Sequence, residues 1–339
     1  MKPSLLELIV CPACHGALSL TARSRDGEEI LEGALTCAGC AARYAIRGGV
    51  PRFVETEAAV GEAGRTATAF GWEWHAFPRI DAHHERQFLD WIAPATAESF
   101  AGRVVLEGGC GKGRHTRLVA GYGARLVLGV DLSDAVDVAF ANTRELPNAH
   151  IVQADLRRLP LSPGSVDHAF SVGVLHHLPV PREGFEALAR AVRPGGALTV
   201  WVYGAENNVW IARVVSPVRT GFTSRIPPRA LYGLSWLVSV PLWVVLKTLY
   251  RPAGSKALAW MRRLLFYYPY LGYISKFPFR EIHHIVHDHL AAPVAHYLTR
   301  AEVLEMYGVA GISDARVEWH NRNSWRGFGR KASPEGRSA

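Results

Sequence analysis

Four cysteines near the start of the chain have the spacing of a metal site. Cys11 and Cys14 form one CxxC pair, and Cys37 and Cys40 form a second pair 22 residues later. Two such pairs, each on a tight turn, can present four thiolates in tetrahedral geometry to zinc. Four protein ligands leave no vacant position, so the predicted site is structural. A redox pair, or a ribbon that keeps its fold without metal, is the alternative.

A glycine-rich loop follows the short apolar run Val104–Leu106, and its residues are Glu107, Gly108, Gly109, Cys110, Gly111, Lys112 and Gly113. Glycines let a ligand approach the backbone closely. Free N–H groups at the start of the following helix suit a carboxylate or a phosphate. Dinucleotide enzymes carry such a loop too, so the loop alone predicts only a nucleotide-like ligand.

Two acidic residues follow the loop at equal intervals. Asp131 lies 24 residues after Glu107, and Asp155 lies 24 residues after Asp131. This spacing corresponds to one strand–helix unit per acid, which places each acid at the end of a strand. Asp131 with Leu132, and Asp155 with Leu156, are therefore predicted to bind a cofactor, Asp131 through ribose hydroxyls.

Two groups of histidines are candidates for proton transfer. His176 and His177 follow the fourth predicted strand, and either can serve as a base if the acceptor must lose a proton. His283 and His287 are four residues apart and share one helix face, where they can form a proton network or bind a metal. Packing roles are the alternative for all four.

The elements that must position these residues alternate between short buried strands and helices. The predicted strands are Val104–Leu106, Leu126–Val130, Ala149–Gln153, Val166–Val172 and Ala197–Tyr203, with helices at Arg114–Gly121, from Ser133, and at Phe185–Val192. This alternation predicts an α/β fold with a doubly wound, Rossmann-like parallel sheet. A helix at Arg300–Gly308 and strands at Ala315–Trp319 and Trp325–Phe328 are expected to complete it.

Composition shifts divide the chain into predicted segments. They are a zinc-ribbon domain at 1–55, a linker and N-terminal helical cap at 56–102, a Rossmann-like core at 103–203, a basic, apolar helical insert at 204–295, the C-terminal part of the core at 296–330, and a polar tail at 331–339. The linker itself is expected at 56–65, with a turn and then a helix over Phe70–Trp91.

The motifs together resemble those of class I S-adenosylmethionine (SAM)-dependent methyltransferases, in the group that includes ubiquinone and menaquinone biosynthesis enzymes. The resemblance covers about residues 103–203, with weaker support from 300–328. It implies a methionine-binding role for Glu107, Gly109 and Gly111, a ribose-binding role for Asp131, an adenine-binding role for Asp155 beside Leu156, and a methyl-transfer site lined by Val174, Leu175, His176 and His177.

This chain departs mildly from the family pattern. Glu107-Gly108-Gly109 stands where Asp-Leu-Gly is commoner, and Lys112 replaces a common Thr or Ser. The four-cysteine unit resembles the Trm112-type zinc ribbon, a partner or fused domain that stabilises or activates methyltransferases. Trp72 is predicted to close over the SAM cation, with Trp74 and His75 beside it, unless the group only anchors the first helix.

The insert differs in composition from the rest of the chain. It holds eleven Lys/Arg and three Asp/Glu, which accounts for 11 − 3 = +8, the formal net charge of the whole chain. Residues 230–246 are uncharged and apolar, although Gly233 and Pro241 interrupt them. A buried lid or oligomer contact, a peripheral membrane contact and a transmembrane span are the alternatives.

The predicted function is SAM-dependent methyl transfer to a small or lipid-like metabolite, because the insert is apolar. Nucleic acid is expected to be a less favoured partner. The alternatives are an RNA or protein methyltransferase that uses the zinc ribbon and basic insert, and a non-catalytic SAM-binding protein. The N-terminal residues lack a signal-length apolar run, which predicts a cytoplasmic location, with membrane association through the insert as an alternative.

Overall fold

The computed structural model describes residues 1–54 and 61–333. Its larger sheet has the order β10-β11-β9-β8-β5-β6-β7. The strands of this sheet are β5 (Val104–Gly108), β6 (Leu126–Asp131), β7 (Ala149–Gln153), β8 (Val166–Val172), β9 (Val192–Tyr203), β10 (Ile312–His320) and β11 (Ser324–Lys331). Strands β5 to β9 are parallel, whereas β11 and β10 add an antiparallel hairpin at one edge. This confirms the predicted α/β, Rossmann-like fold class.

Helices cover both faces of this sheet, which is why its central strands are apolar throughout. They are α2 (His83–Ile92), α3 (Arg114–Gly121), α4 (Val136–Thr143), α5 (Pro181–Ala191) and α10 (Arg300–Val309). Val105 and Val127 pack with α2 and α3, whereas Leu106 and Leu128 belong to the core cluster of α5 and α10. Alternate residues of one strand therefore contribute to cores on opposite faces.

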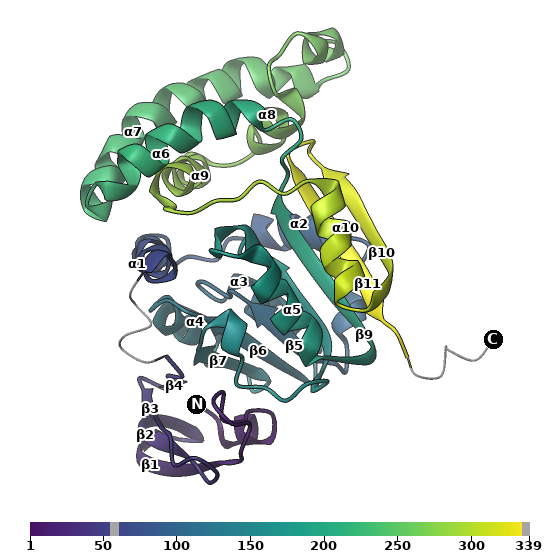
Figure 1. Cartoon of the computed structure of the whole chain (residues 1–339). Helices are drawn as coiled ribbons and strands as arrows, with labels where there is room; N and C mark the ends of the chain where they lie inside the picture. The colour runs from purple at the N-terminus through teal and green to yellow at the C-terminus, as the bar shows by residue number, and fades with distance from the viewer. Residues whose placement is uncertain (55–60, 334–339) are drawn as a thin grey trace, which may run out of the picture.

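The N-terminal unit is a separate antiparallel sheet with the order β1-β2-β3-β4. Its strands are β1 (Leu18–Asp26), β2 (Glu29–Cys37), β3 (Arg43–Arg47) and β4 (Val50–Pro51). Leu5 and Ile9, which precede β1, share a core cluster with Leu159 and Leu161, which lie between β7 and β8 of the larger sheet. Arg52 forms a parallel bridge to Gln153 at the end of β7. The unit is thus packed against the main sheet (Figure 1).

The insert forms a helical layer over the carboxyl ends of the parallel strands (Figure 1). Its helices are α6 (Ser216–Gly221), α7 (Pro228–Val245), α8 (Tyr268–Ile274) and α9 (Phe279–Ala291). Helix α1 (Gly61–Ala76) lies between this layer and the sheet, and it contacts α7. The insert has its own small core, which includes Leu246, Tyr250 and Ile282.

Several sequence expectations differ from the structure. Strand β2 was not predicted, because its alternating pattern is interrupted by Gly33 and Ala34. The region before the sheet contains two helices, and α1 begins at Gly61, so residues 61–65 are helical and not a linker. The rest of the expected linker, 56–60, lies outside the described residues, as does most of the expected tail, 334–339.

Candidate active site

The glycine loop lies where β5 ends and α3 begins, at the carboxyl edge of the parallel strands. Gly109 and Gly111 have φ angles of 80° and 50°, which residues with a Cβ rarely adopt. A Cβ on Gly109 would lie 2.3 Å from Val174 Cγ2, and one on Gly111 would lie 2.7 Å from Trp74 Nε1. The loop backbone is therefore pressed against these two side chains, and both glycines line a pocket.

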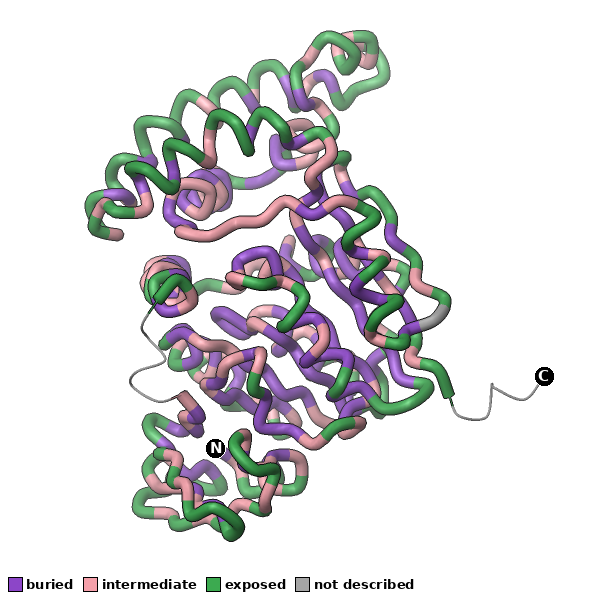
Figure 2. The backbone as a smooth tube through the Cα atoms, in the orientation of Figure 1, coloured by how far each residue is buried: buried purple, intermediate pink, exposed green. Residues whose placement is uncertain are grey.

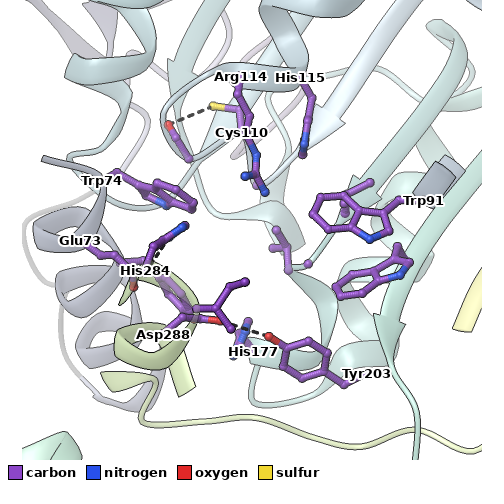
Figure 3. A pocket seen from close by; sticks show the side chains of 18 of the residues that line it. Glu73, Trp74, Trp91, Cys110, Arg114, His115, His177, Tyr203, His284 and Asp288 are labelled. Atoms are coloured by element: carbon purple, nitrogen blue, oxygen red, sulfur yellow. Dashed lines mark hydrogen bonds and ion pairs between the residues drawn. The ribbon is translucent and has the colours of Figure 1, made fainter. Parts of the chain in front are cut away.

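This pocket separates the loop from the insert, so it has two sides. The donor side, as we call it, is formed by Gly109, Gly111, Asp131, Leu132, Asp155, Leu156 and Val174. The insert side is formed by Glu73 and Trp74 of α1 with Tyr270, Tyr273, Phe277, Glu281, His284 and Asp288 of α8, α9 and the segment between them. Figure 3 shows Trp74 and His284 of the insert side facing an open space, with Arg114 of α3 on the opposite side of it.

Asp131 holds the glycine loop in place. Its Oδ2 accepts the Gly111 N–H at 2.8 Å, and its Oδ1 accepts the Ser133 N–H at 2.9 Å and the Ser133 hydroxyl at 2.7 Å. Burial raises the pKa of Asp131, although these hydrogen bonds favour the carboxylate. Oδ1 uses both of its lone pairs on Ser133, whereas Oδ2 retains one, so the side chain can accept a ribose hydroxyl at Oδ2.

Asp155 begins a short helical turn after β7. Its carboxylate accepts the Arg157 N–H at 2.9 Å and forms an ion pair with the Arg157 guanidinium at 2.7 Å. These contacts fix the carboxylate at the edge of the pocket, beside Leu156. The adenine-binding role remains a prediction for this residue, and its position is compatible with it.

Glu107 and Gly108 do not line the pocket. The Glu107 side chain turns toward α3, where Thr116 donates a hydrogen bond to it and His115 Nδ1 lies 3.1 Å from Oε1. Burial raises the pKa of Glu107 to about 8. A Cβ on Gly108 would clash with Leu156 beneath the loop. The structure therefore gives Glu107 a role in anchoring α3, which corrects its predicted direct contact with methionine.

Of the two adjacent histidines, only His177 lines the pocket. Its Nδ1 lies 2.6 Å from the Val294 carbonyl oxygen, so Nδ1 carries the proton and Nε2 keeps a free lone pair. Burial lowers the pKa of His177, which keeps the ring neutral and able to accept a proton. His176 is fully buried under the Tyr203 ring, 3.9 Å between centroids, so its predicted catalytic role does not fit its position.

The histidines of α9 also differ in whether they line the pocket. His284 lines the pocket, and its Nε2 lies 2.9 Å from Oε1 of the fully buried Glu73. Burial opposes the charge on both groups, but their contacts outweigh it, lowering the pKa of Glu73 to about 2 and raising that of His284 to about 9. A charged pair therefore spans α1 and α9 at neutral pH (Figure 3).

Neither His283 nor His287 lines the pocket, which corrects their predicted catalytic roles. His283 Nε2 lies 2.7 Å from the Ser235 hydroxyl and 3.1 Å from the Tyr232 carbonyl, both in α7. The His287 ring packs on Trp72, 5.5 Å between centroids. Trp72 is thereby held against the insert, and Trp74, two residues further along α1, faces the pocket instead.

Two cations, Lys112 in the glycine loop and Arg114 directly after it, line the pocket but were not predicted as site residues. Lys112 donates to the Phe77 and Arg79 carbonyls at 3.0 and 2.8 Å, and burial lowers its pKa to about 7. Arg114 lies over the rings of Trp74 and Trp91, 5.6 and 5.4 Å from their centroids. Within residues 1–54 and 61–333, Arg114 forms no ion pair, and it points into the pocket (Figure 3).

His83, His84 and Glu281 come close enough together to hold a metal ion. However, His84 Nδ1 accepts the Asp81 N–H at 2.9 Å. The neutral ring must then carry its proton on Nε2, which faces Glu281 Oε2 at 3.7 Å. The protonated nitrogen is beyond hydrogen-bond distance of Glu281 and offers no lone pair to a metal, so this cluster is better described as a group of polar side chains than as a metal site.

The four N-terminal cysteines are gathered as a zinc site requires. Their sulfur atoms all lie within 4.8 Å of one another, with Cys11–Cys40 and Cys14–Cys37 separations of 3.7 and 3.4 Å. Zn–S bonds of about 2.3 Å in a tetrahedron place sulfurs roughly 3.8 Å apart. The cluster is therefore compatible with structural zinc. Cys110 is buried in the glycine loop, far from this cluster in the fold, as a packing residue.

Comparison with known proteins agrees with this geometry. Residues 106–200 match a family model described as a methyltransferase domain, and residues 2–49 match one described as a Trm112p-like protein. The chain thus carries a class I SAM-dependent methyltransferase domain behind an N-terminal Trm112-like domain, which confirms the resemblance seen in the sequence. SAM is the cofactor of this class, and the glycine cradle and Asp131 fit it.

Part of this chain is similar in sequence to curated proteins named tRNA U34 carboxymethyltransferase. The protein of Hahella chejuensis is 40% identical over 130 residues, which span 35% of this chain and 40% of the relative. That of Geobacter sp. strain M21 is 33% identical over 148 residues, spanning 42% of this chain and 44% of the relative. The chain therefore spans less than half the length of these relatives.

Solved structures give weaker matches. An O-methyltransferase family protein from Burkholderia thailandensis is 13% identical, with a TM-score of 0.47 and coverage of 77% of this chain and 60% of that chain. Magnesium protoporphyrin IX methyltransferase from Synechocystis PCC 6803 is also 13% identical, with a TM-score of 0.46 and coverage of 80% and 98%.

The prediction of a small or lipid-like acceptor is contradicted by the relatives, which are named for tRNA. The expectation that nucleic acid is a less favoured partner is wrong for the same reason. The structure explains the error, because none of residues 230–246 lines the pocket. The apolar run that favoured a lipid-like substrate lies elsewhere, on the outer side of the insert (Figure 2).

Proposed function

We propose that this chain is a SAM-dependent methyltransferase that modifies a base of tRNA. The observation that carries the proposal is the similarity of the methyltransferase domain to tRNA-modifying relatives, 40% identical over 130 residues in one case. Because the matched segment is less than half of each relative, their target position, U34, is not transferred to this chain.

The insert side of the pocket supports a base as the acceptor. Trp74, Tyr270 and Tyr273 line it, and Tyr203 of β9 and Trp91 of α2 line the same pocket. An enzyme that acts on a base must take it out of the stack and hold it in a closed site. Aromatic rings accept any base by stacking, which contributes about 1–3 kcal/mol per base. Such rings provide a site for one extruded nucleotide opposite the donor.

His177 is the residue we propose as the base. Its unprotonated Nε2 is available at the pocket, between Asp288 and Tyr203 in Figure 3. Tyr203 donates a hydrogen bond to Asp288 Oδ2 at 3.1 Å, which fixes both groups beside the imidazole. SAM supplies an electrophilic methyl group, so the protein's task is to align the acceptor and to receive its proton.

A second candidate is transfer of a carboxymethyl group, the activity in the relatives' name, which requires a donor of the SAM type whose sulfonium carries a carboxymethyl group in place of the methyl group. Arg114 favours it, because an unpaired guanidinium in the pocket can bind a carboxylate in a bidentate manner. The carboxylate of the methionine part of SAM is the competing partner for the same cation. Mass analysis of the modified nucleoside distinguishes the two candidates by the mass of the group added.

The test is a transfer assay with SAM labelled at the methyl carbon and three acceptor pools, namely tRNA, lipid extract and small metabolites. The proposal expects label in tRNA, and in a single nucleoside after digestion. Label only in lipid or metabolite fractions contradicts it. The variant Asp131→Ala should abolish the label in every pool, which controls for a contaminating enzyme.

A further inference from the structure

The outer side of the insert carries most of the exposed apolar surface of the protein. Of the 19 large hydrophobic side chains that are exposed among the described residues, 16 lie between residues 209 and 266. Leu237 on α7 and Leu264 in the segment after it are the most open, at 73% and 75% exposed. We call the exposed surface of 209–266 the outer face; Figure 2 shows it at the end of the molecule remote from the N-terminal sheet.

The outer face includes large aromatic side chains as well as aliphatic ones. Phe222, Trp236, Trp260 and Phe266 are between 44% and 64% exposed. Monomeric proteins rarely expose contiguous apolar surface of this extent, and such patches mark partner or membrane contacts. Trp and Phe side chains are common in protein segments that bind at the bilayer interface.

Helix α7 presents this surface because its other side is already occupied. Leu231, Ser235 and Ser239 are buried toward α9, and the Ser235 hydroxyl lies 2.7 Å from His283 Nε2. The side chains of 230–246 that point away from α9 have no contact with the pocket. The outer face therefore serves neither the insert core nor the active site.

The charges around the outer face are of one sign. Exposed cations of the insert include Arg213, Arg225, Arg229, Arg251, Arg262 and Arg263. None of its three acidic residues is exposed, because Glu281 is buried, while Asp288 and Glu206 are partly buried and hydrogen-bonded to Tyr203 and Trp325. An exposed surface with cations and without acids is complementary to anionic lipid headgroups.

We propose that the outer face docks the protein peripherally on an anionic lipid bilayer. The aliphatic and aromatic side chains would enter the headgroup region while the arginines contact lipid phosphates. RNA is a poorer occupant, because a phosphate backbone offers nothing to side chains such as Leu237 and Val240. This inference goes beyond the proposed function and does not depend on the acceptor.

A peripheral position fits the structure better than a transmembrane one. The helical stretch Pro228–Gly254 is long and apolar enough to cross a bilayer, with a mean hydropathy of 1.5. However, the Ser235 hydroxyl and the Tyr232 carbonyl tie one side of it to His283 of α9. Spanning would separate these polar groups from their partners in a medium that supplies none.

The test is sedimentation of the full chain with vesicles of phosphatidylglycerol and phosphatidylcholine, compared with phosphatidylcholine alone. We expect binding to the anionic vesicles that high salt weakens. Leu237→Glu with Leu264→Glu should weaken it at least about tenfold, because burial of one leucine alone favours transfer by about that factor. Arg251→Glu with Arg263→Glu should remove the preference for anionic lipid.

Val309→Glu is the matched control, since Val309 is 54% exposed on α10, outside the insert. It should bind vesicles as the unchanged protein does, and circular dichroism and SAM affinity should show that every variant is folded. Three results would overturn the proposal: no vesicle binding while tRNA binds, resistance to alkaline carbonate after membrane binding, or a dimer that the Leu237 and Leu264 changes dissociate.

Discussion

The two sides of the pocket are built in different ways. The donor side comes from one stretch of chain, in which a glycine loop and Asp131 and Asp155 follow successive strands at equal spacing. The insert side joins Glu73 of α1 to His284 of α9, which lie 211 residues apart in the sequence. A short-range pattern specifies the donor site, whereas long-range packing specifies the acceptor site.

The N-terminal unit tests whether the donor side depends on a neighbouring domain. Its contacts reach β7 and α4 through Arg52, which bridges Gln153 and pairs with Asp137. Zinc removal by a chelator, or Cys37→Ser, should unfold this unit, because structural zinc contributes about 10 kcal/mol to such domains. We expect about one zinc per chain by metal analysis, and Cys110→Ala should retain it. A stable, metal-free protein would refute the zinc site.

The charged pair on the insert side predicts a loss of stability with pH. Glu73→Gln leaves His284 buried without its nearest carboxylate, so the free energy of unfolding should fall by about 3–5 kcal/mol. The pKa of His284 is raised to about 9, so its stabilisation is complete below pH 6.5 and is lost as the pH rises through 9.

Denaturant unfolding at pH 6 and pH 10 checks this prediction. The unchanged protein should be less stable at pH 10, and Glu73→Gln should show a smaller difference between the two pH values. If the difference in stability between pH 6 and pH 10 were equal in the two proteins, the ion pair would not form. The two sides of the pocket would then be less distinct than described.

The donor side is tested by the ribose-binding acid. Asp131→Ala removes three hydrogen bonds that hold Gly111 and Ser133, in addition to the predicted ribose contacts. Hydrogen bonds to charged groups are worth about 1.5–3 kcal/mol, so SAM affinity should fall about 100-fold in calorimetry. Asp137→Ala, on α4, should bind SAM normally. An unchanged affinity in Asp131→Ala would remove the assignment.

The most localised expected effect concerns His177, because its replacement should change kcat alone. His177→Gln should lower kcat about 100-fold and leave SAM affinity unchanged. Because burial lowers the pKa of His177, activity should be flat near neutral pH and fall only at acid pH, as the ring becomes protonated. His75→Gln serves as the control, since His75 is exposed. If His177→Gln had the same pH profile of activity as the unchanged protein, His177 would be a packing residue and not the base.

The sequence predicted the donor side of the pocket better than the insert side. The bounds of α3, β7 and β8 match the prediction because buried strands and glycine turns are local signals. Asp131 and Asp155 were placed at the site because strand ends share one edge of a parallel sheet, and Val174 was placed there by the family resemblance; all three line the pocket. Asn321 and Asn323, in the turn after β10, also line the pocket.

The missed residues are those positioned by packing between distant segments. Trp72 and Trp74 are equivalent in the sequence, and only the position of His287 against Trp72 leaves Trp74 facing the pocket. His284 stands among four similar histidines, and no local signal shows which one meets Glu73. Arg114 was recognisable in principle, because it directly follows the loop at the start of α3.

A crossed binding measurement tests the central claim most directly. SAM affinity and tRNA affinity are measured for Asp131→Ala on the donor side and for Tyr270→Ala, whose ring lines the insert side. We predict that Asp131→Ala weakens SAM binding with little effect on tRNA, and that Tyr270→Ala weakens tRNA binding with SAM affinity retained. Loss of SAM binding in Tyr270→Ala, with tRNA binding unchanged, would contradict the account of a pocket that holds donor and tRNA base on opposite sides.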